Sequence, residues 1–318
     1  MADAVVTGAA GFLGSHLVDR LLADGVSVLA VDNLSTGRLA NLRDAAQSKQ
    51  FRLRRLDLVG AKTLPRAEQY FHLASPASPP MYQRDPVGTL LVNAEGTHRV
   101  LEAARRADAR VLLASTSEVY GDPEVHPQVE SYWGRVNPVG LRSCYDEGKR
   151  YSEALAVAYR RRYGLDVRIA RIFNTYGPRM DPNDGRVVSN FIVQGLSGGP
   201  FTLYGTGLQT RSFCYVADMV EGVARLMEAE RDVPTPMNLG NPREFTMRAT
   251  AELVARILGI PARFERRPLP DDDPRQRSPD IRLARKYLRW SPRIPLEAGL
   301  ARTVEHFRGL GLPRRGRA

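Results

Sequence analysis

The chain has 318 residues, of which 43% are hydrophobic, and carries a formal net charge of +11 at pH 7. This length and apolar content predict two domains, or one large α/β domain with an appendage. A basic excess suits nucleic acid, a membrane surface or an anionic small substrate, but here basic and acidic residues are mixed and form no continuous basic helix. We therefore expect an anionic small substrate and no nucleic-acid partner.

The two cysteines, Cys144 and Cys214, provide neither a disulfide framework nor a metal-binding spacing. We expect reduced, buried thiols and no metal site. No charged leader precedes the first predicted strand, and no apolar stretch approaches the about 20 residues that a membrane-spanning helix needs. We therefore expect a cytoplasmic protein with no membrane partner, and a solvated basic tail at 313–318.

Short apolar runs alternate with amphipathic stretches along the N-terminal half. In chain order, the pattern predicts a strand at 4–6, a helix at 12–23, and strands at 27–31, 51–53 and 70–73. A long helix follows at 88–107, then a strand at 111–114, a helix from 145 to 163 and a strand at 167–172. This alternation indicates the α/β class, with a Rossmann-type doubly wound parallel sheet.

The character of the sequence changes after Asn174, where proline and glycine become frequent, elements shorten and arginines concentrate. We place a domain boundary near residue 175. Residues 1–175 are predicted to form a dinucleotide-binding domain, and residues 176–318 a smaller α/β domain that binds the substrate. A helix predicted at 216–228, within the segment 208–240, is expected to pack back on the sheet.

Three glycines, Gly8, Gly11 and Gly14, lie between the first strand and the first helix, where a dinucleotide-binding turn is expected. Glycine permits the tight turn and lets the backbone approach a pyrophosphate at the helix N-terminus. The spacing is Gly-x-x-Gly-x-x-Gly rather than Gly-x-Gly-x-x-Gly. The glycines alone are therefore weak evidence for a cofactor site.

Asp32 strengthens the cofactor prediction because it ends the second strand, about 20 residues further on, where a carboxylate binds the ribose diol. Such a carboxylate repels a 2′-phosphate, which favours NAD over NADP, although the nearby Arg38 would have the opposite effect. The alternative for Asp32 is a turn-starting role supported by Asn33. Asp57, after the third strand, is predicted to contact the adenine.

Tyr145 and Lys149 stand four residues apart, so their side chains share one face of the predicted helix. A free phenol has a pKa near ~10, and a neighbouring ammonium group is expected to lower the pKa of Tyr145. A tyrosine tuned in this way can accept the proton of a sugar hydroxyl while hydride leaves the same carbon. Chance alone produces this spacing often, so its weight comes from the glycine turn and Asp32 upstream.

Five longer stretches carry a resemblance to a known family; they are residues 72–80, 113–123, 144–150, 171–179 and 183–191. With the glycine turn, they make the chain similar to extended short-chain dehydrogenases/reductases. More narrowly, the chain resembles the UDP-glucuronate decarboxylases, which are also called UDP-xylose synthases. The likeness covers nearly all of the chain except the last dozen residues.

The resemblance implies a tightly held NAD that is reduced and reoxidised within one turnover. Tyr145, helped by Lys149, would deprotonate the sugar 4-hydroxyl while NAD takes the C4 hydride. The resulting β-keto acid loses CO2, and return of a proton to C5 and of hydride to C4 gives UDP-xylose. Thr116 and Ser117 would hydrogen-bond the 4-oxygen, and Glu118 would position the sugar or relay a proton near C5.

The resemblance also assigns residues to three roles. The catalytic residues are Tyr145, Lys149, Glu118, Ser117, Thr116 and Arg277. The cofactor-binding residues are Gly8, Gly11, Phe12, Leu13, Gly14, Asp32, Asn33, Ser35, Thr36, Gly37, Asp57, Leu58, Leu73, Ala74, Ser75, Tyr145, Lys149, Thr175 and Arg186. The substrate-binding residues are Glu118, Asn174, Asn190, Tyr204, Arg211 and Arg277, with the two arginines near the diphosphate. Singly, each arginine would be read as a solvated surface residue.

The chain departs from the family pattern at two places. Val92 replaces a threonine that contacts the cofactor, so one hydrogen bond to NAD is expected to be missing. The acidic run Asp271-Asp272-Asp273 is one residue longer than the family pattern.

Two other functions remain open from the sequence. One is a nucleotide-sugar 4-epimerase or 4,6-dehydratase on the same fold, although a dehydratase would have an Asp-Glu pair where this chain has Ser117-Glu118. The other is a catalytically silent NAD-sensing or nucleic-acid-binding protein, supported by the basic charge alone. The predicted helices at 88–107 and 145–163 carry apolar stripes, which either face only the sheet or, as is common in the family, form the four-helix interface of a homodimer.

Overall fold

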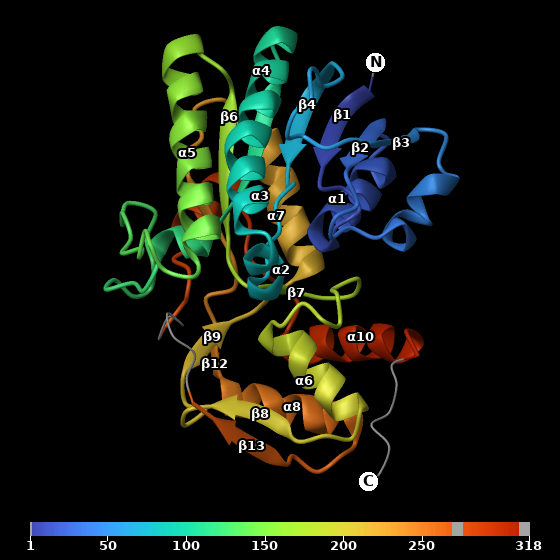
Figure 1. Ribbon diagram of the computed structural model, residues 1–318, viewed down its shortest axis with the longest axis vertical. Helices are drawn as coiled ribbons and strands as arrows, with labels where there is room; N and C mark the ends of the chain where they lie inside the picture. Colours follow the sequence, from blue (N-terminus) through green and yellow to red (C-terminus); the bar gives the residue numbers. More distant parts are fainter. Residues whose placement is uncertain (1, 269–275, 312–318) are drawn as a thin grey trace.

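The computed structural model describes residues 2–268 and 276–311 (Figure 1). Its centre is a seven-stranded sheet in the order β11-β6-β5-β4-β1-β2-β3, and every neighbouring pair is parallel. The strands are β1 (Ala2–Thr7), β2 (Val28–Asp32), β3 (Phe51–Arg55), β4 (Ala67–His72), β5 (Arg110–Thr116), β6 (Val167–Ile172) and β11 (Met237–Leu239). The predicted doubly wound α/β fold is confirmed.

Helices cover both faces of this sheet, as the buried apolar strands require. On one face, α4 (Thr97–Ala107) and α5 (Ser143–Tyr163) stand side by side against β4, β5 and β6 (Figure 1). On the other face, α1 (Phe12–Ala23) packs beside α7 (Val216–Glu228). The helix predicted at 216–228 therefore does return to the sheet, although it lies far along the chain.

The prediction of a single regular helix at 88–107 is wrong in detail. The segment forms α3 (Pro86–Leu91), a π-helical turn (Val92–Gly96) and then α4. Asn93 donates its side-chain amide to Thr89 O at 2.8 Å, and the Ser152 hydroxyl of α5 donates to Asn93 O at 2.7 Å. These side-chain bonds occupy backbone carbonyls of the segment, which is how an inserted polar group interrupts a regular helix.

The C-terminal part lies beyond the carboxyl ends of the sheet strands (Figure 1). Its strands form three two-stranded pairs, β7 (Thr175–Tyr176) with β10 (Cys214–Tyr215), β8 (Phe201–Tyr204) with β13 (Phe264–Arg267), and β9 (Thr210–Ser212) with β12 (Glu244–Thr246). Its helices are α6 (Val187–Leu196), α8 (Met247–Leu258), α9 (Arg282–Leu288) and α10 (Leu296–Gly309), and the short α2 (Pro79–Arg84) lies on the sheet side. In the described chain, no helix combines the length and apolar character needed to cross a membrane.

One hydrophobic cluster joins the C-terminal part to the α1 and α7 face of the sheet. It includes Val6 of β1, Val18 of α1 and Val223 of α7, together with Val254 of α8 and Phe307 of α10. A second cluster lies under α4 and α5 on the opposite face. Because apolar burial drives folding, the two parts of the chain share one stabilising core on the α1 and α7 face of the sheet.

Arg168 of β6 is fully buried and secures the segment that follows α7. Its guanidinium donates to Ala229 O at 3.0 Å, to Glu230 O at 2.9 Å and to Arg231 O at 3.3 Å, and it pairs with Asp166. Burial lowers the pKa of Arg168, and the Asp166 carboxylate opposes that shift. The segment that follows α7 therefore depends on this arginine for its hydrogen bonds.

We expect Arg168→Met to destabilise the protein by about 3 kcal/mol, because three backbone carbonyls lose their donor while the Asp166 carboxylate keeps Arg110. Urea unfolding followed by circular dichroism measures this change. Arg161→Met, at an exposed position in the last turn of α5, is the control and should change stability by less than about 0.5 kcal/mol. Equal effects of the two substitutions would contradict the role given to Arg168.

Candidate active site

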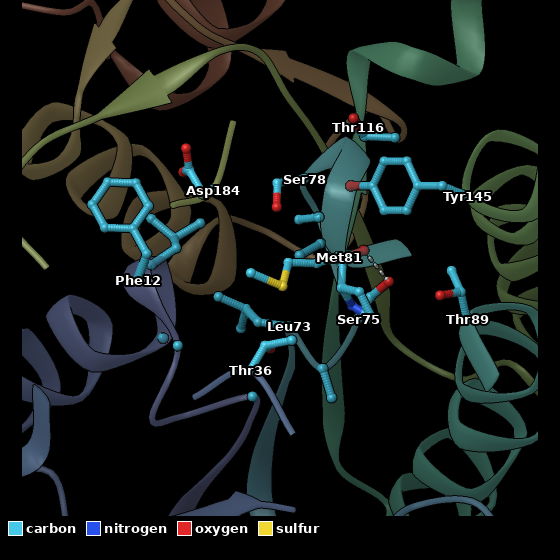
Figure 2. Close-up of a pocket in the computed structure, with 18 of the residues that line it drawn as sticks. Phe12, Thr36, Leu73, Ser75, Ser78, Met81, Thr89, Thr116, Tyr145 and Asp184 are labelled. Atoms are coloured by element: carbon cyan, nitrogen blue, oxygen red, sulfur yellow. Dashed lines mark hydrogen bonds between the residues drawn. The ribbon is translucent and has the colours of Figure 1, made fainter. Parts of the chain in front are cut away.

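A cavity of about 920 Å³ opens at the carboxyl ends of the central strands. It lies where the strand order reverses between β1 and β4, which is the ligand-binding position of a doubly wound sheet. Figure 2 shows Tyr145 and Thr116 on one side of this cavity, and Phe12 and Asp184 on the other. Residues from both parts of the chain line the cavity.

The glycine turn after β1 forms one wall of the cavity. Gly8 has φ +70°, and a Cβ there would lie 2.8 Å from the backbone of Ala74. A Cβ on Gly14 would lie 2.1 Å from Gly8 O, so the turn and α1 meet without room for a side chain. Gly11 precedes α1 and provides no side-chain cap. The first N–H groups of α1 therefore form an anion-binding position beside the cavity.

Asp32 ends β2 and holds two loops together. Its carboxylate accepts the N–H of Ala10 at 2.8 Å and the N–H of Leu34 at 2.8 Å. The bond from the Leu34 N–H is the contact of a turn-starting aspartate, which is the alternative role considered for Asp32. Arg38, which would favour a 2′-phosphate, pairs instead with Asp181 at 2.6 Å, and this contact supports the preference for NAD.

Tyr145 and Lys149 share one face of α5, as predicted, and both are buried. The Lys149 ammonium donates to Ala114 O at 2.9 Å and lies 5.9 Å from the centroid of the Tyr145 ring. Burial lowers the pKa of Lys149 to about 8, against the opposing charge of Glu153. Tyr82 of α2 stacks on Tyr145 with the ring centroids 5.1 Å apart.

The expected lowering of the Tyr145 pKa is wrong for this structure. Burial raises the pKa of Tyr145, and the negative charge of Glu118 raises it further. A hydrogen bond with Thr116 and the positive charge of Arg186 act in the opposite direction but are weaker. The reason is that burial penalises the phenolate, while the lysine points to a backbone carbonyl rather than to the phenol oxygen.

Glu118 follows β5 and lies between two arginines. Its Oε1 accepts from Arg277 at 3.0 Å, and its Oε2 accepts from Arg142. Burial alone would raise the pKa of this carboxyl, but the two guanidinium groups outweigh it and hold the pKa well below its usual range. Glu118 is therefore ionised, and it does not point to solvent as an isolated turn-capping residue would.

Asp146 was not predicted as a site residue, although it directly follows Tyr145 in the sequence. The Asp146 carboxyl group lies beside the Glu118 carboxyl group, so the charge of one affects the other. Burial first, and the Glu118 charge second, raise the pKa of Asp146 to about 8. Arg142 was also missed, because it lies in an irregular segment before α5 where no motif marks it.

Most of the predicted residues line this one cavity; they are Gly8, Gly11, Phe12, Leu13, Gly14, Asp32, Asn33, Ser35, Thr36, Asp57, Leu58, Leu73, Ala74, Ser75, Thr116, Ser117, Glu118, Tyr145, Lys149, Asn174, Thr175, Arg186, Arg211 and Arg277. Val92 lines it as well. Three predicted residues do not. Gly37 packs against the Asp32 carboxylate, Asn190 donates to Gly185 O at 2.8 Å, and Tyr204 is 37% exposed at the end of β8. The acidic run Asp271-Asp272-Asp273 lies outside the described residues.

Comparison with known proteins places the chain in a class. The NAD dependent epimerase/dehydratase family model matches residues 4–240. The chain therefore belongs to the NAD dependent epimerase/dehydratase family. Within it, the chain is 51% identical over 304 residues to UDP-glucuronic acid decarboxylase 1 of Xenopus tropicalis, covering 96% of this chain and 72% of that protein. It is 52% identical to UDP-glucuronic acid decarboxylase 6 of Arabidopsis thaliana, covering 98% and 90%.

Solved structures give the same fold with different activities. UDP-glucuronic acid 4-epimerase from Bacillus cereus, in complex with UDP-glucuronic acid and NAD, matches with a TM-score of 0.88 at 26% identity, covering 96% of this chain and 99% of that one. The fold alone therefore does not separate decarboxylases from epimerases. The higher identity to the decarboxylases does, and it confirms the resemblance drawn from the sequence motifs.

NAD is the cofactor of this family, and the cavity fits it. The glycine turn leaves no room for a side chain where a pyrophosphate would approach, and the uncapped N–H groups of α1 match its negative charge. Asp32 and Asp57 line the same cavity on the side of β2 and β3. These residues would hold the adenosine half of the cofactor.

We expect Gly14→Ala to remove most of the bound NAD, because the added Cβ would displace the turn at Gly8. The NAD released on acid denaturation of the purified protein, relative to protein concentration, measures the effect. Gly309→Ala, at a position where a Cβ meets nothing within 4 Å, should retain the full content. Unchanged NAD in the Gly14 variant would show that this turn does not bind the cofactor.

Proposed function

We propose that this protein converts UDP-glucuronate into UDP-xylose and CO2 through transient oxidation of the sugar at C4. The observation that carries the proposal is the cluster of Tyr145, Glu118, Arg142 and Arg277 at the cavity, in a chain about half identical to UDP-glucuronic acid decarboxylases. This cluster places a proton acceptor, a carboxylate and two cations around one end of a sugar site.

Tyr145 accepts the proton of the 4-hydroxyl, and its hydrogen bond with Thr116 directs the phenol oxygen towards the end of β5. NAD, when bound, supplies the hydride acceptor and a positive charge that favours the phenolate. The 4-ketone then accepts the electron pair of the C5–C6 bond as CO2 leaves. Thr116 and Ser117 stabilise the enolate oxygen at C4, and Tyr145 returns its proton to that oxygen when the ketone is reduced.

The two parts of the chain divide the ligands in this proposal. Residues 1–175 hold NAD, and residues 176–318 hold the nucleotide sugar. Arg211 and Arg277 are buried and line the cavity from the C-terminal part, where guanidinium groups suit a diphosphate. Asn174, Thr175 and Arg186 line it as well. Asn190 and Tyr204 can contact the substrate, as the resemblance implies, only if the substrate extends beyond the present cavity.

A 4-epimerase is the second candidate, because a UDP-glucuronic acid 4-epimerase shares the fold. An epimerase must let the 4-keto sugar rotate in the site so that its other face meets the cofactor, and the sugar must keep its carboxyl group. The position of Glu118 at the sugar end of the cavity favours decarboxylation, since that reaction needs a proton delivered near C5 and an epimerisation at C4 does not. Identity of 26% to the epimerase against 51% to a decarboxylase points the same way.

We also propose a cytoplasmic homodimer. Val87, Leu90 and Leu91 of α3 are exposed apolar residues, at 65%, 43% and 38%, and α3 packs against α5, where Tyr151 is 52% exposed. A two-fold axis beside these helices would bury both apolar sets in a four-helix interface. Neither chemistry nor cofactor binding in the proposal requires the second copy.

Purified protein incubated with UDP-glucuronate should release CO2 and form a UDP-pentose, measured by trapping labelled CO2 and by NMR of the nucleotide product. The reaction consumes no external reductant, because the hydride taken from C4 returns to C4 within the turnover. UDP-galacturonate as the product would instead establish the epimerase. Recovery of unchanged substrate under conditions where NAD is bound would reject both.

Tyr145→Phe should lower kcat by about 10³-fold or more while NAD content stays the same, because the ring and its stacking on Tyr82 remain and only the proton acceptor is lost. Steady-state kinetics with UDP-glucuronate, together with the NAD content of the protein, test this. Full activity in the variant would refute the assigned base.

A further inference from the structure

The reaction proposed above needs a proton that Tyr145 does not supply. Tyr145 takes one proton from the 4-hydroxyl and returns one to the same oxygen, so it gains and loses the same number of protons in each turnover. Loss of CO2 leaves an electron pair on C5 that must take up another proton. Each turnover therefore consumes one proton at C5, and a group near the sugar ring must deliver it.

Glu118 lines the cavity but has no proton of its own to give. Arg142 and Arg277 both donate to its carboxylate, and these contacts stabilise the charged form. A neighbouring acid can supply the proton through Glu118. Asp146 is such a neighbour, because it is 7% exposed, lies beside Glu118 and does not line the cavity itself.

The contacts of Asp146 show which of the two carboxyl groups holds the proton. Its Oδ1 is fully buried and receives no hydrogen bond from any donor in the described chain. Two neighbouring carboxylates repel each other when both are charged, so the carboxyl group that receives fewer hydrogen bonds holds a proton more readily. Since both arginines donate to Glu118, Glu118 takes the charge and Asp146 takes the proton.

We propose that Asp146 is the proton store for C5, and that it acts through Glu118. The Asp146 hydroxyl passes its proton to the Glu118 carboxylate, and Glu118 passes a proton to C5. The electron pair of the enolate double bond forms the new C5–H bond, and the C4 oxygen becomes a ketone again. A proton taken up from the solvent then returns Asp146 to its acid form, which supplies the one proton that each turnover consumes. Asp146 is thus a positioning residue that acts through Glu118, and the inference rests on the proposed decarboxylation.

The proposal fixes the pH dependence. Asp146 carries its proton below its pKa of about 8 and loses it above. The rate of C5 protonation should therefore decrease as the pH rises through about 8. It should not decrease when the pH is lowered through this range. The charged or titratable groups around Asp146 are Glu118, Arg142, Arg277, Tyr82, Tyr145 and Cys144. The pKa of Tyr82 and that of Cys144 are both raised by burial, so both stay neutral in this range.

Asp146→Asn tests the proposal, because the amide keeps a hydrogen-bond donor to Glu118 but has no acidic proton. We expect kcat to fall about 10²-fold, KM to change little, and the fall in rate above pH 8 to disappear. The solvent deuterium isotope effect on kcat should increase. Asp146→Glu, which restores an acidic proton, should recover part of the activity. Glu147→Gln, on the same turn of α5 and paired only loosely with Arg150 at 3.5 Å, should behave like the unmodified protein.

Difference infrared spectroscopy of the unmodified protein gives a readout that needs no turnover. A protonated carboxyl C=O band, shifted by ¹³C-aspartate labelling, should be present at pH 6 and disappear with a midpoint near pH 8. Absence of that band, or an Asp146→Asn variant with unchanged kcat and pH profile, would overturn the proposal even if a variant folded poorly. If the unmodified protein releases no CO2 from UDP-glucuronate, the proposed function fails instead, and the band still reports the Asp146 proton.

Discussion

The ion pairs of the Glu118 carboxylate are the interaction on which the site depends. Partial burial would disfavour a single charge, and the carboxylate stays ionised because guanidinium groups reach it from two directions. Arg142 precedes α5, and Arg277 comes from the C-terminal part. One ion therefore fixes the end of β5, the start of α5 and the second half of the chain relative to one another.

This electrostatic arrangement also explains the order of protonation around the sugar. Burial first, and the charge on Glu118 second, raise the pKa of Tyr145 and that of Asp146, so both neighbours are neutral in the structure. The cavity is thus prepared for chemistry by one fixed negative charge rather than by a pre-formed phenolate.

The sequence predicted the parts of this structure that follow from local patterns. The alternation of apolar runs located the parallel sheet, and the glycine turn with Asp32 located the cofactor end. The four-residue spacing placed Tyr145 and Lys149 on one face of α5, as found. The effect of Lys149 on the phenol was wrong, because spacing along a helix does not tell where an ammonium group finds its hydrogen bond, here Ala114 O. The partnership of Asp146 with Glu118 joins a helix to a strand end, and no local pattern records it.

The long sequence separation between Arg277 and Glu118 has a consequence for folding during synthesis. This arginine lies 159 residues after the carboxylate that it neutralises. A nascent polypeptide that has completed the parallel sheet up to β6 still lacks one of the two cations for Glu118, and the aliphatic core under α7 and α10 is also missing. Such a truncated species would hold Glu118 with a single guanidinium group. The complete charge arrangement therefore forms only after the chain beyond residue 277 has folded onto the sheet.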